Sequence, residues 1–234
     1  MQHLAQKFSS DDAALPAHAQ VYLRLRDMVL YGDLAPGQAV TIQGLIERLS
    51  VGMTPVREAI RRLISQGALE LQGNRRVCVP LLSAADIGEI IIAREWLDPY
   101  LTRQAVKHVT AADIAELTHL DGALDGAIGQ GDLRAYLHLN HQFHVYIYKL
   151  ARSPILTDLA EGLWLRYGPS MRVLCGRLGT QNLPDNHKDT IVAMQAGDAD
   201  AAAAAIRADV RQGMDQLRAS LQTAAASGDS IDKE

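Results

Sequence analysis

The spacing of apolar residues divides this chain into two parts near residue 80. Before this point, three stretches carry apolar side chains three and four positions apart, and two short stretches of alternating character follow them. The first spacing is typical of helices with one buried face, and the second of strands. After residue 83, six further segments repeat with the helical period. The sequence therefore predicts a mainly α protein in which a small N-terminal domain precedes an all-helical C-terminal bundle.

The three N-terminal helices have the order of a helix-turn-helix domain. The first is predicted over 20–31, the second over 41–49, and a short turn containing Gly52 leads into the third. The hydroxyl of Thr54 can cap the third helix, and Pro55 suits its first position, where no backbone N–H is needed. The two alternating stretches that follow predict a β-hairpin, so the domain is expected to be a winged helix-turn-helix.

Such a domain makes DNA the expected partner. The second helix of the motif enters the major groove with its N-terminus first, which would place Thr54 and Arg57 near bases or phosphates. The charge distribution supports this hypothesis, because residues 21–80 hold eight Lys/Arg against five Asp/Glu, whereas residues 81–234 hold 14 against 20. The excess of positive charge thus lies in the part that is predicted to contact DNA.

The motifs at 32–37, 54–60 and 67–69 together resemble the N-terminal domain of GntR-type transcription regulators. The resemblance covers residues 18–80 and implies that Arg57 contacts DNA and that Gly73 lies at the tip of the wing. This chain has glutamine and methionine at two positions where many members carry arginine, 43 and 53, so its base preference is expected to differ. The candidate DNA-binding residues are Gln43, Thr54, Pro55, Arg57, Arg61, Gly73, Asn74 and Arg75.

A charged side chain interrupts the apolar stripe of the first bundle helix. Arg94 lies in the middle of that stripe, where a buried guanidinium needs a partner. The partner is either a nearby carboxylate, Glu95 or Asp98, or an incoming anion. Tyr167 and Ser170 are predicted on the inner side of a later helix, where they could hydrogen bond to the same anion.

Several other polar side chains also fall on or beside inward faces of the bundle. His144 is predicted to point inward, whereas His138 and His141 on the same helix are predicted to face solvent. A second inward histidine and a carboxylate at the border of a core face lie on later helices. Two imidazoles, a carboxylate and an amide could therefore converge inside the bundle: His144, His187, Asp209 and Asn140.

The helical half resembles the FadR C-terminal, or FCD, ligand-binding domain, on the motifs at 94–98 and 140–144 and on His187 followed by Gly197-Asp198. The resemblance implies a divalent metal ion, with zinc expected first and manganese or nickel as alternatives. The implied ligands are Asn140, His144, His187 and Asp209, of which the last stands where histidine is usual. A small carboxylate effector would bind beside the metal, held by Arg94, Tyr167 and Ser170.

The combined resemblance implies a homodimeric, ligand-responsive transcription regulator that binds a double-stranded DNA operator, with a repressor as the expected type. Two other interpretations remain open. Two histidines and a carboxylate also suit a metal-dependent hydrolase or oxygenase, but no general base accompanies them and the DNA-binding head would be unexplained, so we expect no enzyme. Alternatively, the metal ion itself is the signal.

The predicted domain limits follow from these patterns. We expect flexible termini at 1–17 and 227–234, the winged domain at 18–80, a linker at 81–83 and the bundle at 84–226. Cys78 and Cys175 are isolated and in apolar surroundings, so they are predicted to be buried free thiols, which fits a reducing cytoplasm. No stretch approaches the ~20 apolar residues of a membrane span, so no membrane partner is expected.

Overall fold

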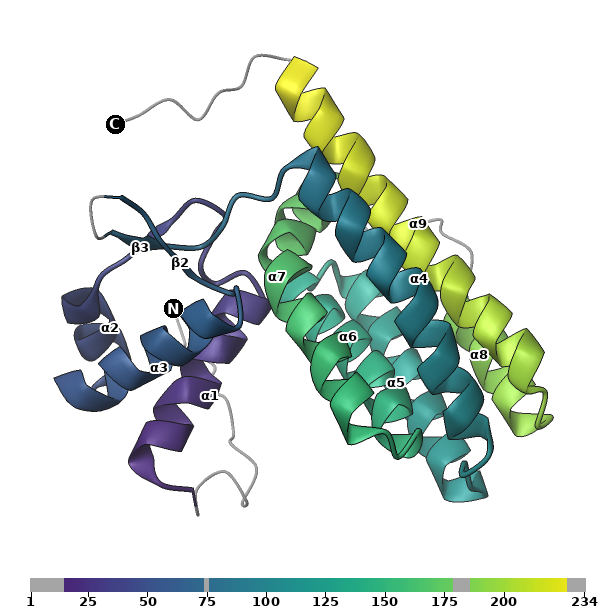
Figure 1. Cartoon of the computed structure of the whole chain (residues 1–234). Helices are drawn as coiled ribbons and strands as arrows, with labels where there is room; N and C mark the ends of the chain where they lie inside the picture. Colours follow the sequence, from purple (N-terminus) through teal and green to yellow (C-terminus); the bar gives the residue numbers. More distant parts are fainter. Residues whose placement is uncertain (1–14, 74–75, 179–185, 227–234) are drawn as a thin grey trace.

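The computed structural model describes residues 15–73, 76–178 and 186–226. A small N-terminal head lies beside a larger helical bundle, as Figure 1 shows. This arrangement confirms the predicted mainly α fold with a winged head and a helical C-terminal domain. No helix among the described residues is both long and apolar enough to cross a membrane.

The head contains three helices and a small antiparallel sheet. The helices are α1 (Ala17–Leu30), α2 (Ile42–Leu49) and α3 (Met53–Ser65). Their inward positions recur every three or four residues, as an amphipathic helix requires. The fully buried side chains Leu25, Val29, Val56 and Leu63 form the centre of this core.

The start of α3 differs from the prediction. The helix begins at Met53, and Gly52 occupies the N-cap position with an extended backbone (φ −74°, ψ 167°). Thr54 is therefore not the cap, because the chain enters the helix earlier than expected. Pro55 still lies in the first turn, where backbone N–H groups have no acceptor within the helix, so the ring costs no hydrogen bond.

The sheet has three strands in the order β1-β3-β2, where the sequence had predicted only a hairpin. The predicted strands are β2 (Glu70–Leu71) and β3 (Val77–Cys78), and β1 (Ala39–Val40) pairs with β3 on its other side. The two predicted strands are joined by a turn, which is a local signal, whereas β1 pairs with β3 across a long stretch of chain, which no local pattern indicates. Cys78 is buried as a free thiol, and burial raises its pKa to about 11. The side chain of Cys175 lies outside the described residues.

Within its described residues, the bundle has the six predicted helices: α4 (Ala84–Val106), α5 (Ala111–Gln130), α6 (Leu133–Leu150), α7 (Pro154–Leu178), α8 (Asn186–Gln195) and α9 (Ala199–Ala226). Capping boxes at Ser83 and Thr110 begin α4 and α5. α4 and α9 lie side by side over most of their length in Figure 1, joined by ion pairs at 2.8 Å from Arg103 and Arg211.

The head packs directly on the bundle through α1, α6 and α7. The hydroxyl of Tyr31, just after α1, lies 3.1 Å from Nδ1 of His141 on α6, and the ring of His138 lies 4.9 Å from the ring of Tyr31. Arg134 reaches Asp33 at 2.8 Å. The prediction that His138 and His141 face solvent is therefore wrong, because the face of α6 that points away from the bundle core is covered by the head.

Candidate DNA-binding surface and ion-binding hollow

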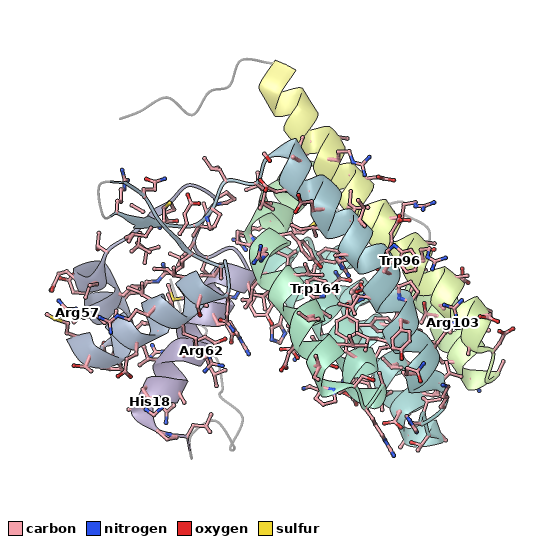
Figure 2. The ribbon with its side chains drawn as sticks, in the orientation of Figure 1. His18, Arg57, Arg62, Trp96, Arg103 and Trp164 are labelled. Carbon is pink, nitrogen blue, oxygen red and sulfur yellow. The ribbon has the colours of Figure 1, made fainter. Side chains whose placement is uncertain are left out.

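The predicted DNA-contacting side chains lie on the exposed face of α3 and beside it. Thr54, Arg57 and Arg61 are exposed at positions that share one helix face, and Figure 2 shows Arg57 at the outer edge of the head. Among the described residues, no carboxylate pairs with Arg57 or Arg61. These guanidinium groups are therefore available to an external anion such as a phosphate.

The remaining DNA candidates lie around this helix. Gln43 is exposed on α2, where its amide donates to Glu47 at 2.9 Å, and Pro55 is half-buried in the first turn of α3. Gly73 is exposed at the end of the wing strand, with open space around its Cα. Asn74 and Arg75 lie outside the described residues.

Inside the bundle, three of the predicted metal ligands converge from three helices. His144 of α6, His187 of α8 and Asp209 of α9 each present a ligand atom, and these atoms lie within 4.8 Å of one another. Nε2 of His144 lies 3.0 Å from one oxygen of Asp209, and Nε2 of His187 lies 3.5 Å from the other. These three side chains therefore meet at one place, as predicted.

The fourth predicted ligand lies in the wall of an adjacent cavity, which we call the hollow. Its wall includes Asn140, Arg94, His144, Tyr167 and Asp209, and its volume is about 40 Å³. Asn140 is half-buried one helical turn before His144. A cavity of this volume holds an ion with one or two waters.

A buried aspartate that the sequence analysis missed orients His187. Oδ1 of Asp121 lies 3.5 Å from Nδ1 of His187, so it can accept the Nδ1 proton and leave the Nε2 lone pair on the side of Asp209. The ring of His187 also stacks on Phe143, with centroids 4.0 Å apart. A signal existed, because Asp121 follows Leu120 and lies one turn after Leu117 on the buried stripe of α5.

The protonation states favour cation binding. Burial alone would raise the pKa of Asp209, but His187, the hydrogen bond from His144 and Arg94 together hold it well below its usual value. Burial lowers the pKa of His144, despite its contact with Asp209. Nδ1 of His144 is buried and has no hydrogen-bond partner among the described residues. Two imidazoles and one carboxylate are a donor set that fits Zn²⁺.

Arg94 has an internal partner. It is only 4% exposed, and its Nη2 and Nε donate to Oδ2 of Asp98 at 2.6 and 3.0 Å. Its guanidinium also lies over the rings of Trp164 and Tyr167, at 4.7 and 4.9 Å. Of the partners considered from the sequence, the structure therefore contains the ion pair with Asp98, while Glu95 pairs with Arg211 of α9.

The two other predicted effector ligands differ in position. The hydroxyl of Tyr167 is buried in the wall of the hollow and has no hydrogen-bond partner among the described residues. Ser170 is buried on α7, but it is not part of the wall. Tyr167 is thus the member of this pair that can offer a hydrogen bond to a molecule in the hollow.

A winged helix-turn-helix head joined to a helical domain with a polar hollow defines a class, the DNA-binding transcription regulators. Comparison with known families agrees with this class. Residues 17–79 match the model described as bacterial regulatory proteins, gntR family, and residues 89–212 match the FCD domain. The chain belongs to the GntR family and carries an FCD domain.

Two regulators of Escherichia coli K12 show the extent of the likeness. The HTH-type transcriptional regulator McbR is 32% identical over 182 residues, which cover 76% of this chain and 82% of McbR. The HTH-type transcriptional repressor RspR is 24% identical over 148 residues, covering 63% of this chain and 65% of RspR. The structure of E. coli McbR/YncC superposes with a TM-score of 0.83 at 28% identity, covering 88% of this chain and 99% of that one.

These relatives bear on the alternative interpretation of this protein as a metal-dependent enzyme. The matched proteins are named as transcriptional regulators, and the family consists of DNA-binding regulators rather than enzymes. The interpretation as a metal-dependent hydrolase or oxygenase is therefore set aside. The histidines and carboxylates of the bundle belong to the FCD domain of a transcription regulator.

Proposed function

We propose that this protein is a homodimeric operator-binding regulator whose DNA affinity is set by a divalent cation and a small carboxylate bound in the bundle. The observation that carries the proposal is the convergence of His144, His187 and Asp209, with ligand atoms within 4.8 Å of one another, inside a domain packed on a DNA-binding head. Zinc is the first candidate, with manganese or nickel as alternatives, and Asn140 would supply a fourth ligand from the wall of the hollow.

The hollow supports a carboxylate effector through two features. A cation held by two histidines, one aspartate and Asn140 would take an outside oxygen ligand by expanding its coordination to five. The buried hydroxyl of Tyr167 and the positive charge of Arg94 face the same hollow and favour an anion there. Because Arg94 already donates to Asp98, we assign its role to the electrostatic field, with the metal and Tyr167 as the direct contacts.

A row of exposed apolar side chains on α4 supports the homodimer. Ile92, Trp96 and Tyr100 recur at every fourth residue and are 62%, 78% and 47% exposed. Figure 2 shows Trp96 projecting from α4. Large exposed aromatic side chains in one row are typical of protein interfaces. A second copy of this chain packed on the row would give the two recognition helices that a palindromic operator needs.

The test combines metal analysis with operator binding. Purified protein is stripped with a chelator, reloaded with Zn²⁺ and titrated against operator DNA at fixed salt, with and without a panel of small carboxylates. We expect the double variant His144→Ala and His187→Ala to lose bound metal and to lose an effector-dependent change in operator affinity of about 5-fold to 150-fold. The matched control, His108→Ala with His119→Ala, removes two histidines outside the hollow and should retain both.

Full metal content in the His144 and His187 variant, by elemental analysis, would refute the ion site. A second candidate function is a sensor of the cation alone. The volume of the hollow, about 40 Å³, favours this candidate over large acids. If the metal changes operator affinity and no carboxylate changes it further, the ion is the signal.

A further inference from the structure

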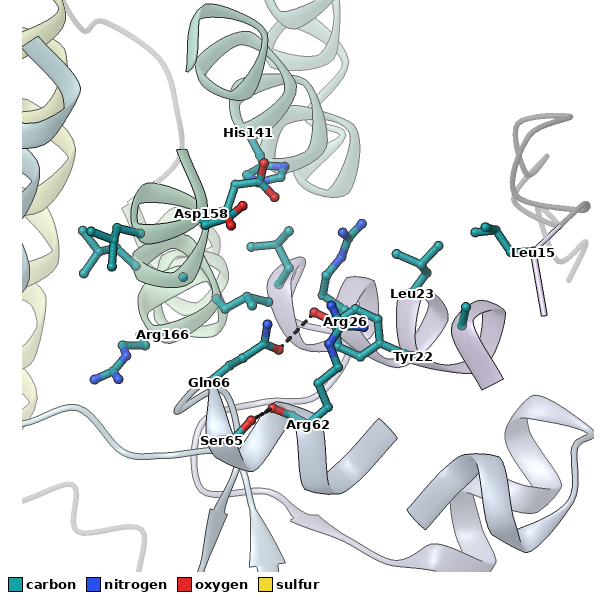
Figure 3. Close-up of a pocket in the computed structure, with 17 residues that line it drawn as sticks. Leu15, Tyr22, Leu23, Arg26, Arg62, Ser65, Gln66, His141, Asp158 and Arg166 are labelled. Carbon is teal, nitrogen blue, oxygen red and sulfur yellow. Dashed lines mark hydrogen bonds between the residues drawn. The ribbon is translucent and has the colours of Figure 1, made fainter. Parts of the chain in front are cut away.

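A second and much larger cavity lies between the head and the bundle. Its volume is about 670 Å³, against about 40 Å³ for the hollow. Figure 3 shows its walls, which come from α1, the C-terminal end of α3, α7 and His141 of α6. Binding sites for small organic molecules usually measure roughly 300–1,000 Å³, so this cavity has the size of a ligand site.

The cationic wall of this cavity lies beside the end of the recognition helix. The guanidinium of Arg62, in the last turn of α3, lies 3.7 Å from the ring centroid of Tyr22. Arg166 of α7 packs its guanidinium against Gly67, just beyond α3. No carboxylate pairs with Arg62 or Arg166 in the described part of the chain. Both charges are therefore available to an anionic group.

An acidic wall faces the same cavity from the first half of α7. Asp158 and Glu161 line it, and in Figure 3 Asp158 lies near His141, across from Arg62 and Gln66. Neither carboxylate has a salt bridge to any described residue. The cavity thus carries charges of both signs that form no salt bridge among the described residues, and a purely anionic ligand would match only one of the two signs.

The spacing of these charges limits the length of a matching molecule. Glu161 and Asp158 precede Arg166 on α7 by five and eight residues, which separates their backbones by roughly 7–12 Å at ~1.5 Å per residue. A free amino acid carries both of its charges on one residue, which is shorter than this backbone separation. An extended peptide spans at most ~3.3–3.6 Å per residue, so two to four residues match it.

Apolar side chains also line this cavity. Leu23 and Leu30 of α1 and Leu163 of α7 line the cavity. His141 adds a polar contact, because its Nδ1 can accept from the hydroxyl of Tyr31 and its Nε2 then carries a proton that can be donated. We propose that this cavity binds a short apolar peptide of two to four residues, with its free carboxylate toward Arg62 and Arg166 and its free ammonium toward Asp158 and Glu161.

Such a peptide would touch both the recognition helix and the bundle. Arg62 and Gln66 belong to the end of α3, and the acidic wall belongs to α7. A ligand that bridges them ties the head to the bundle without entering the hollow. This inference does not depend on the ion site, since none of His144, His187 or Asp209 lines the cavity.

The test uses trileucine as the probe, with isothermal titration of the full-length protein. We expect binding of trileucine, and we expect loss of binding when its amino end is acetylated or its carboxyl end amidated. Arg62→Gln and Glu161→Gln should each weaken binding by about 10-fold to 100-fold, because each removes a charge-assisted hydrogen bond. The control Arg207→Gln, on the outside of α9, should bind as the unmodified protein does.

Three results would overturn the proposal. The first is that trileucine does not bind at millimolar concentration. The second is that the doubly capped peptide binds as tightly as trileucine. The third is that octanoate binds in place of the peptide, which would indicate a site for simple anions. Circular dichroism and thermal melting show whether each variant is folded before it is scored. The His144→Ala and His187→Ala variant should bind trileucine normally, so failure of the ion site and failure of this cavity are distinguishable.

Discussion

The head and the bundle treat their functional charges in opposite ways. In the head, Arg57 and Arg61 project into solvent, and no described carboxylate pairs with them. In the bundle, Arg94 and His144 are buried and each touches a carboxylate of the same domain. The head is thus built for a large external partner, whereas the bundle can accept only what its enclosed groups leave room for.

This difference separates the effects of substitution. An exposed, unpaired charge costs folding almost nothing, so its removal should affect binding alone. A buried charge costs several kcal/mol to desolvate unless it is paired, so its partner becomes part of the stability of the domain. Four predictions test this separation, beginning with the largest effect.

The largest effect is expected from breaking the buried ion pair. Asp98→Ala leaves the guanidinium of Arg94 without its carboxylate in a site that is only 4% exposed. The free energy of unfolding should fall by about 3–5 kcal/mol, measured by urea denaturation. Asp215→Ala removes the partner of the exposed Arg218 and should cost less than about 1 kcal/mol. If both variants lose the same small amount, burial does not govern the bundle charges.

The second-largest effect is expected from a substitution in the head. Arg57→Ala should weaken operator binding by about 1–3 kcal/mol and leave the free energy of unfolding unchanged, because no carboxylate among the described residues pairs with the side chain. Gel shifts at one fixed salt concentration measure the first quantity, and urea denaturation the second. Arg207→Ala, an exposed arginine on α9, serves as the control and should affect neither. Unchanged operator binding in Arg57→Ala would exclude α3 as the recognition helix.

Much of the head could be predicted from sequence, because its pattern is local. Amphipathic stretches separated by glycine turns give the helix order directly, and residues of one helix such as Thr54 and Arg57 share a face by periodicity alone. Two features of the head were missed. Gly52 holds the N-cap position of α3 without a side-chain cap, so no capping side chain signals it. β1 pairs with β3 from a distant part of the chain, so no adjacent turn signals it.

In the bundle, the sequence could predict which side chains point inward, but not which of them meet. Periodicity indicated that His144 and His187 point inward, and the family resemblance joined them to Asp209. Periodicity does not tell which inward faces meet, so the contact of Asp121 with His187 was missed. It also treats any face turned away from the core as solvent-exposed, which made the prediction for His141 wrong, because the head covers that face.

A smaller effect tests whether internal carboxylates orient the metal ligands. Asp121→Asn removes the charged acceptor from Nδ1 of His187 and should lower Zn²⁺ affinity by about 10-fold to 100-fold, measured by competition with a chromogenic chelator. Asp125→Asn is the matched control, since Asp125 lies one turn further along α5, is about half exposed and pairs with Lys188. Equal affinities in the two variants would show that packing on Phe143 suffices to hold the ring.

The smallest effect concerns the boundary between the two regions. Burial first, and then the positive charge of Arg26, hold the pKa of His141 well below 6.5. Near pH 6.5 the unfolded chain therefore binds a proton on this histidine that the folded protein does not bind. The free energy of unfolding consequently decreases as the pH falls below this value. His141→Gln should make the fall between pH 6.5 and 5 shallower by up to ~1.4 kcal/mol per pH unit. The exposed His119→Gln is the control. An unchanged slope in His141→Gln would mean that acid opens the junction of head and bundle before the histidine is protonated.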